Sequence, residues 1–304
     1  MNARNEAAAR LEGWILATKP RTLVAAVVPV LLGTSLAYAD GKVDWLSAAI
    51  ALVCAALIQI ATNLINDLYD FRKGADNEKR LGAKKALNAG LLTERDLAVA
   101  ATATMLAAFG LGLILVWRAG WAILAIGLLS LFFAWAYTGG KYPLAYLGLG
   151  DAFVFLFFGL VAVCGTYYAH HQTVSLASVV VATGVGAIAT NILGVNNLRD
   201  IPTDREVGKK TLAVRFGEEF ARDLYYWLLF VAYCAPFALA LMGYGYGVLL
   251  ALLSLPFAMK QWRIVALERG RALNAALGGT AQLLLIYGAL LSVGLLLSRF
   301  GKPS

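Results

Sequence analysis

The sequence predicts an all-α membrane protein with nine transmembrane helices. The chain has 304 residues, of which 60% are hydrophobic and only 14% are charged, whereas soluble domains carry about 25% charged residues. Its apolar stretches are continuous, which is typical of helices and not of the alternating strands of a membrane β-barrel. Its basic residues gather in alternate connecting segments, as they do in multi-pass membrane proteins. A soluble multidomain protein is therefore excluded.

Nine apolar segments account for most of the chain. In order, they cover residues 22–39, 45–65, 98–117, 120–136, 151–169, 174–197, 224–242, 245–259 and 275–298. Most reach the roughly 17–25 residues that a helix needs to cross about 30 Å of hydrocarbon; the eighth is short and contains Pro256. We expect a single nine-helix domain over residues 22–304. The polar segment 1–21 lacks the apolar core of a cleavable signal peptide.

The basic residues predict the orientation of the chain. With the N-terminus inside, the inner segments hold 22 of the 26 Lys and Arg residues and the outer segments hold 4. The positive-inside rule then places the N-terminus in the cytoplasm and the C-terminus outside a plasma (inner) membrane. The net charge of +8 is thus mainly a topology signal. The partners expected from it are membrane lipids and no nucleic acid, because no basic patch lies on a soluble domain.

Two similar polar motifs stand at the predicted inner ends of the second and sixth segments. They read NLINDLYDFRKGAD (63–76) and NNLRDIPTDREVGKK (196–210). Their shared positions are Asn63, Asp67, Asp70 and Gly74 in the first, and Asn196, Asp200, Asp204 and Gly208 in the second. This weak internal repeat suggests two related helical units that face each other. The loops that carry the motifs extend over 63–97 and 196–223.

Helical spacing predicts that the polar residues of each motif share one face. Positions i, i+3 and i+4 lie together on a helix. If both helices continue past the apolar core, Asn63, Asp67 and Asp70 project together, and the second motif does the same. A charge at the bilayer centre costs about 2.5–3.5 kcal/mol. We therefore expect the site near the inner, cytoplasmic interface, with a cation bound between the helices.

Magnesium with a phosphorylated ligand accounts for both signs of charge in the motifs. Mg²⁺ prefers oxygen ligands and typically uses one or two carboxylates, several waters and substrate phosphates. The predicted metal ligands are Asn63, Asp67, Asp70, Asn196, Asp200 and Asp204. The predicted phosphate contacts are Arg72, Lys73, Lys141, Arg199, Lys209 and Lys210. Ordinary solvated inner loops would explain the basic residues but not two Asn/Asp stripes at helical spacing.

These motifs resemble the two aspartate-rich motifs of the UbiA superfamily of intramembrane prenyltransferases, which have nine transmembrane helices. The resemblance covers nearly the whole chain. Within the superfamily, four stretches are most similar to the polyprenyltransferases that act on 1,4-dihydroxy-2-naphthoate in menaquinone biosynthesis. They are KPRTLVAAVVPVLLG (19–33), NDLYDFRKGAD (66–76), YTGGKYPLAYLGLGDAFVFLFFG (137–159) and NNLRDIPTDREVGKKTLAVRFG (196–217). The first motif departs from the family by having two residues between its aspartates, which leaves Asp70 and Asp76 as alternative second ligands.

The resemblance implies a magnesium-dependent transfer, with two Mg²⁺ ions, of a polyprenyl group from its diphosphate to an aromatic acid. With the dihydroxynaphthoate as acceptor, the prenyl group would replace a carboxylate that leaves as CO₂. The aromatic faces of Tyr137 and Tyr142 are candidates to stabilise the allylic cation, and the alternative is that each is an ordinary interfacial tyrosine. The candidate bases are Asp76 and Asp204.

Several residues keep two interpretations. Asp151 either caps the start of the fifth helix or takes part in catalysis. Lys19 and Arg21 either contact the acceptor carboxylate or mark the inner face. Small residues such as Gly184 and Gly186 allow helices to approach closely.

Other functions share parts of this pattern. A related prenyltransferase acting on 4-hydroxybenzoate, haem or a chlorophyll precursor would carry the same metal motifs. A divalent-cation transporter would also have repeats and conspicuous aspartates, but a permeation path usually needs polar groups at mid-depth. A CDP-alcohol phosphotransferase would carry a longer, DG-initiated motif that this sequence lacks.

Overall fold

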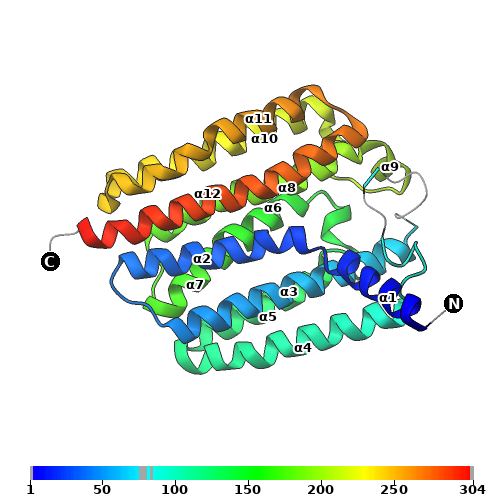
Figure 1. Cartoon of the computed structure of the whole chain (residues 1–304), viewed down its shortest axis with the longest axis horizontal. Coiled ribbons are helices and arrows are strands. Elements are labelled where there is room, and N and C mark those ends of the chain that lie inside the picture. The colour runs from blue at the N-terminus through cyan, green and yellow to red at the C-terminus, as the bar shows by residue number, and fades with distance from the viewer. Residues whose placement is uncertain (1–2, 75–80, 83–84, 302–304) are drawn as a thin grey trace.

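The computed structural model describes residues 3–74, 81–82 and 85–301, and every regular element in these ranges is helical. Eight helical stretches are long and apolar enough to cross a membrane, and the shorter apolar helix Trp121–Ala136 lies among them. Together they match the nine predicted segments in order (Figure 1). The predicted all-α class and the approximate helix count are therefore confirmed.

The first four membrane helices are α2 (Leu23–Ala39), α3 (Trp45–Arg72), α4 (Glu94–Ala119) and α5 (Trp121–Ala136). Local sequence determines where two of them begin. The Asp44 side chain accepts hydrogen bonds from the backbone N–H groups of Leu46 and Ser47 at the start of α3. Thr93 and Asp96 form a reciprocal capping box at the start of α4. Helix α3 continues seven residues past the predicted apolar segment, which ends at residue 65, so the whole first motif up to Asp70 is helical.

The fifth span is a composite of α6 (Gly150–Val154), a π-helical turn η3 (Phe155–Val161) and α7 (Ala162–His171). It is followed by α8 (Leu176–Arg199), the short α9 (Ile201–Glu206), α10 (Leu212–Leu239), η4 (Ala240–Tyr244), η5 (Tyr246–Ser254), α11 (Leu255–Leu267) and α12 (Leu273–Gly301). Two tight crossings allow these spans to pack. A Cβ on Gly186 of α8 would lie 3.0 Å from the Cα of Gly159 of η3, and a Cβ on Gly184 would lie 2.8 Å from the Tyr287 hydroxyl. Glycine at these two positions lets the helices approach closely, because a larger residue would force its neighbour to shift.

The second motif is not one continuous helix, so this expectation was wrong. Helix α8 ends at Arg199, and Asp200 is at once its C-cap and the N-cap of α9. Pro202 occupies the first turn of α9, where its missing N–H costs nothing. Asp200 and Asp204 therefore lie on either side of a bend.

The predicted polar segment 1–21 contains a helix that the sequence did not reveal, α1 (Ala3–Thr18). Trp14 and Ala17 pack in a cluster with residues of α3 and α4. Lys19 follows with a left-handed backbone (φ 47°) and leads into the short turn η1 (Pro20–Thr22). This turn brings the start of α2 beside the first motif.

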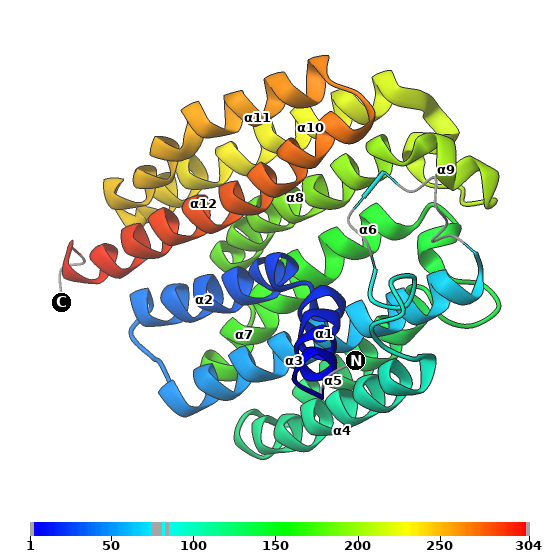
Figure 2. The same ribbon diagram turned by 45° about the vertical axis from the view of Figure 1, so that its right-hand side comes forward.

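The membrane-spanning helices pack around an interior that contains both polar and apolar side chains. Helix α8 lies between α12 on one side and α6 with η3 on the other (Figure 2). The last span, α12, packs along α2, so the C-terminal half of the chain closes against the N-terminal half (Figure 1). Helices α3 and α8 end at the same end of the bundle, on the right of Figure 1, which brings the two motifs to one place.

Candidate active site

A cavity of about 1090 Å³ runs between the two halves of the bundle. It is lined by η1, α2, α3, α4, α5, the composite fifth span, α8, α9 and α12, whereas the described residues of α10, η5 and α11 do not line it. One end is polar and contains most of both motifs. The other end extends between α4, α5 and the fifth span and is apolar. A single cavity can thus hold a molecule with a charged head and a long hydrocarbon tail.

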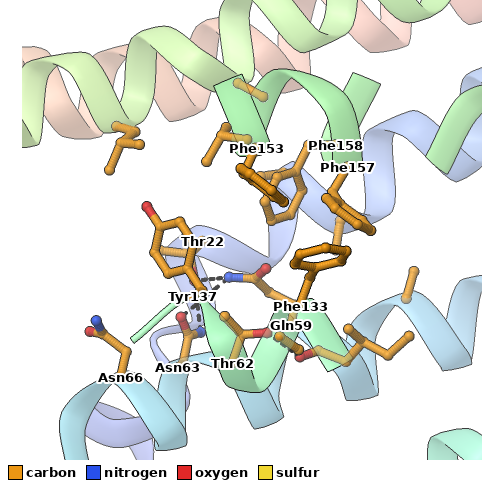
Figure 3. Close-up of a pocket in the computed structure, with 18 of the residues that line it drawn as sticks. Thr22, Gln59, Thr62, Asn63, Asn66, Phe133, Tyr137, Phe153, Phe157 and Phe158 are labelled. Carbon is orange, nitrogen blue, oxygen red and sulfur yellow. Dashed lines mark hydrogen bonds between the residues drawn. The ribbon is translucent and has the colours of Figure 1, made fainter. Parts of the chain in front are cut away.

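Aromatic rings line the apolar side close to the polar end. Phe133 of α5 lies 4.9 Å from Phe153 and 5.3 Å from Phe157 between ring centroids, and Phe158 also lines the cavity. Figure 3 shows these four rings gathered together, with Tyr137, Asn63 and Asn66 to their left. The cavity therefore changes from amide and carboxylate groups to aromatic faces over a short length.

Asn63 of the first motif is held by the turn before α2. Its amide Nδ2 donates to the backbone carbonyl of Thr18 and to Thr22 Oγ1, both at 2.9 Å. Its Oδ1 accepts a hydrogen bond from Gln59 Nε2 at 3.2 Å, as the dashed lines of Figure 3 show. These hydrogen bonds fix the orientation of the amide group, because both its nitrogen and its oxygen have partners. Asn63 therefore ties α3 to the turn before α2 at the polar end of the cavity.

The two aspartates of the first motif are deeply buried and share one lysine. Asp67 is 1% exposed, and its Oδ1 lies 2.7 Å from Lys19 Nζ and 3.1 Å from Lys85 Nζ. Lys85, itself 4% exposed, also lies 3.2 Å from Asp70 Oδ2. The hydroxyl of Tyr146 donates to Asp70 Oδ1 at 3.0 Å. Buried charges of this kind are tolerated because they are paired.

The second motif uses a cation from its own sequence. Arg199 contacts both carboxylate oxygens of Asp200, at 2.7 and 2.5 Å. Its other hydrogen bonds go to the side-chain oxygens of Asn196 and Asn274, each at 2.7 Å. This planar fork is the geometry in which arginine binds carboxylates and phosphates strongly. Arg199 therefore links α8 to α9 and α12.

Lys209 connects the two motifs. Its Nζ lies 3.8 Å from Asp70 Oδ1 of the first motif and 3.5 Å from Asp204 Oδ1 of the second, and 4.9 Å from the centre of the Tyr146 ring. The pKa of Asp204 is raised to about 6. Burial is the largest cause, Lys209 opposes it, and the nearby charges of Asp200 and Asp70 add to it.

The side chains of the polar end offer a donor set that suits magnesium. No three carboxylate, histidine or cysteine side chains of the described residues form a ready-made metal cage. Mg²⁺ does not need one, because it keeps several waters and is completed by substrate phosphates. Both oxygens of Asp67 are buried and accept no hydrogen bond among the described residues, although ammonium groups lie near. Hard carboxylate and amide oxygens, beside cations suited to phosphate, fit a magnesium–diphosphate pair.

The structure brings most of the predicted site residues to this cavity. Those that line it are Asn63, Asp70, Tyr137, Asn196, Arg199, Asp200, Asp204 and Lys209. Asp67 lies directly behind it through its contact with Lys85. Lys73 also lies behind it, with Nζ 2.9 Å from the Thr138 carbonyl oxygen and 4.5 Å from the centre of the Tyr146 ring.

Four predicted residues lie away from the cavity, and one cannot be placed. Arg72 is exposed and pairs with Glu94 at 2.7 Å. Lys141 is exposed beside Tyr142, which is 70% exposed, and Lys210 is exposed as well. None of these four lines the cavity. Asp76 lies outside the described residues.

Sequence reasoning missed three residues of the polar end. Lys85 sits in a charged loop, and nothing in its spacing indicated that it is buried against two aspartates. Tyr146 lies in the stretch 137–159, where no pattern distinguished it from its neighbours. Asn274 lies at the start of α12, far from both motifs in the sequence. Only the tertiary fold brings them together.

This arrangement defines a helical membrane protein with a cavity that is polar at one end and apolar at the other. The sequence matches the model of the UbiA prenyltransferase family over residues 26–286. The chain belongs to this family, and it is a multi-span membrane prenyltransferase.

Relatives of known name agree with this assignment. The chain is 37% identical over 300 residues to 1,4-dihydroxy-2-naphthoate octaprenyltransferase of Escherichia coli, covering 96% of this chain and 97% of that protein. It is 36% identical to the protein of the same name from Mycobacterium tuberculosis, covering 96% and 98%. It is 31% identical to UbiA prenyltransferase domain-containing protein 1 of Danio rerio, covering 95% and 85%.

Solved structures share the fold at low sequence identity. A UbiA homolog from Aeropyrum pernix in its apo form superimposes with a TM-score of 0.69 at 16% identity, covering 88% of this chain and 96% of that chain. A UbiA homolog from Archaeoglobus fulgidus, bound to DMAPP and Mg²⁺, has a TM-score of 0.62 at 18% identity, covering 92% and 99%.

Proposed function

We propose that this protein transfers a polyprenyl group from polyprenyl diphosphate to 1,4-dihydroxy-2-naphthoate, with loss of the acceptor carboxylate as CO₂. The observation that supports this most strongly is the link between the two motifs through Lys209, at the polar end of a cavity whose other end is apolar. The diphosphate would lie at the polar end and the prenyl chain at the other. The relatives named as 1,4-dihydroxy-2-naphthoate octaprenyltransferases support the choice of acceptor.

The first and second motifs would hold magnesium together with the diphosphate. The ligands in this proposal are Asn63, Asp67, Asp70, Asn196, Asp200 and Asp204, which bind two Mg²⁺ ions directly or through water. When bound, the metal neutralises the charge of the diphosphate as it leaves. The UbiA homolog from Archaeoglobus fulgidus bound to DMAPP and Mg²⁺ supports the use of a divalent metal.

The cationic side chains of the site would bind the diphosphate. Lys85 and Lys209 each sit between two carboxylates. Their ammonium groups would contact the phosphate oxygens of the bound substrate. Arg199 presents a rigid fork. As the bond between the prenyl carbon and the diphosphate oxygen breaks, the positive charge left on the allylic group faces aromatic rings. Tyr137 and Phe133 are placed to stabilise it by about 0.5–2 kcal/mol.

The proposal is tested with purified protein, Mg²⁺, a polyprenyl diphosphate and 1,4-dihydroxy-2-naphthoate labelled at its carboxyl carbon. We expect labelled CO₂ to be released in step with prenylation. Prenylation of 4-hydroxybenzoate with its carboxylate retained, and no reaction of the naphthoate, would assign the protein to a different acceptor within the same family.

The orientation of the site is part of the proposal. The excess of basic residues at the motif end of the bundle supports an active site near the cytoplasmic face, with the N-terminus inside and the C-terminus outside. A reporter fused after Gly74 or Gly208 should respond from the cytoplasm, and one in the 170–173 loop from outside. Responses from opposite sides for Gly74 and Gly208 would contradict a shared site.

A further inference from the structure

Asp151 is a buried carboxylate that the metal and diphosphate chemistry does not use. It lies in the first turn of α6, is 6% exposed, and lines the cavity. Its Oδ2 accepts a long hydrogen bond, 3.4 Å, from Asn197 Nδ2 of α8. The N-cap position of α6 is Leu149, so Asp151 does not occupy the capping position that its sequence context allowed.

Asp151 differs from the other aspartates that line the cavity in the charge of its neighbours. Asp70, Asp200 and Asp204 each lie within 4 Å of a lysine or arginine nitrogen. Within the described part of the chain, Asp151 has no such cationic partner, and the side chain that donates a hydrogen bond to it is the neutral amide of Asn197. A carboxylate without a cation is a poor match for a diphosphate. It is well suited to accept a proton or a hydrogen bond.

The neighbours of Asp151 are those that an aromatic acceptor requires. A Cβ on Gly150 would lie 3.1 Å from the Tyr137 hydroxyl, so the Tyr137 ring packs on the start of α6. Phe153, two residues after Asp151, belongs to the group of phenylalanines in Figure 3. Burial and the charges of Asp151, Asp70 and Asp204 raise the pKa of Tyr137. The Tyr137 phenol therefore stays protonated, whereas Asp151 is a carboxylate at the start of α6 that can take up a proton.

We propose that Asp151 accepts a hydrogen bond from a ring hydroxyl of the aromatic acceptor and takes its proton as the prenyl group is transferred. This inference rests on the proposed function. As the hydroxyl proton moves to Asp151, the ring carbon forms its bond to the prenyl carbon, whose bond to the diphosphate oxygen breaks. Loss of CO₂ returns an electron pair to the ring and restores a phenolate, which recovers the proton from Asp151. Atoms and charge balance without any further reactant.

This assignment gives two tasks to different carboxylates of the cavity. The sequence offered Asp204 as a base, but Asp204 shares Lys209 with Asp70 at the cation-rich end. Asp151 instead stands on the fifth span, next to the aromatic wall. The acceptor would lie flat against that wall, with its hydroxyl directed to α6 and its reacting carbon towards the diphosphate.

A binding cycle tests the hydrogen bond. Inhibition constants are measured for 2-naphthoate, 1-hydroxy-2-naphthoate and 4-hydroxy-2-naphthoate with the wild-type protein and with Asp151→Ala. A hydroxyl bound to a carboxylate should make one of the hydroxylated acids bind about tenfold tighter than 2-naphthoate in the wild type. That preference should fall to about twofold in Asp151→Ala. A preference that is equal in both proteins, or that the wild type lacks, overturns the proposal.

Turnover tests the proton transfer. Asp151→Asn keeps the size of the side chain, and its rate of prenyl transfer should fall about 100-fold or more. Magnesium-dependent retention of labelled polyprenyl diphosphate should stay within twofold of the wild type, as it should in the exposed control Asp223→Asn. A variant that transfers as fast as the wild type, or that loses prenyl diphosphate as well, overturns the role of Asp151. Failure of the wild type itself to use the naphthoate contradicts the proposed acceptor instead.

Discussion

The two aspartate-rich motifs have similar sequences but different local structures. The first lies on a single helix, α3, with Asn63, Asp67 and Asp70 on consecutive turns. The second is divided by a bend, because α8 ends before Asp200 and Asp204 belongs to α9. The spacings of two and three residues between the aspartates reflect this difference. A continuous helix and a bent one need different separations to present two carboxylates to the same cavity.

The cations of the two motifs also come from different places. The first motif is neutralised by residues distant in sequence, Lys19 and Lys85. The second is neutralised by its own Arg199 and Lys209. The first motif is therefore built by tertiary folding, and the second largely by local sequence. The comparison predicts that changes in the first motif will affect both folding and activity, and that changes in the second will affect mainly activity.

The largest effects should come from the central aspartate of each motif. Asp67→Asn and Asp200→Asn should each lower the rate of prenyl transfer by about 10³-fold, because each removes a charged ligand from one shared electrostatic site. The measurement is turnover in detergent or nanodiscs, with elution volume as the check on folding. If one of the two variants kept wild-type turnover, the motifs would not serve one site.

The next effect in size is on thermal stability, and it should distinguish Lys85 from Lys209. Lys85→Met leaves Asp67 and Asp70 without their shared buried partner, which should destabilise the protein by about 3–5 kcal/mol. Lys209→Met should lower turnover to a similar degree but change the thermal unfolding temperature little, because its side chain is 17% exposed. Equal losses of thermal stability would show that the two motifs do not differ in how they are built.

The smallest effect is expected at Arg72, which lies in the first motif but outside the cavity. Its exposed pair with Glu94 contributes about 0–1 kcal/mol. Arg72→Gln should therefore change turnover and the Michaelis constant for the prenyl diphosphate by less than about twofold. A tenfold rise in that constant would return Arg72 to the diphosphate site and contradict its placement here.

The sequence was sufficient for the membrane class, the order of the spans and both motifs. Continuous apolar segments and helical Asn/Asp spacing are local signals, because they depend only on residues that are near one another in the sequence. The bend at Asp200 could also have been recognised, since Pro202 is strongly disfavoured inside a helix. The burial of Lys85, the contact of Tyr146 with Asp70 and the exposure of Arg72 could not. They depend on how a loop folds back over α3, and basic residues of inner loops look alike in sequence whether they face solvent or substrate.

The most direct test is whether both motifs are needed to bind the same metal–diphosphate unit. The measurement is the affinity of an unreactive polyprenyl thiolodiphosphate for the wild type, Asp67→Asn and Asp200→Asn, each with Mg²⁺ and with excess chelator. We predict that the wild type binds the analogue at least about tenfold more tightly with Mg²⁺ than without it, and that either substitution removes this gain. Binding that is independent of Mg²⁺, or a magnesium gain that persists in one of the two variants, would contradict a single site built by both motifs.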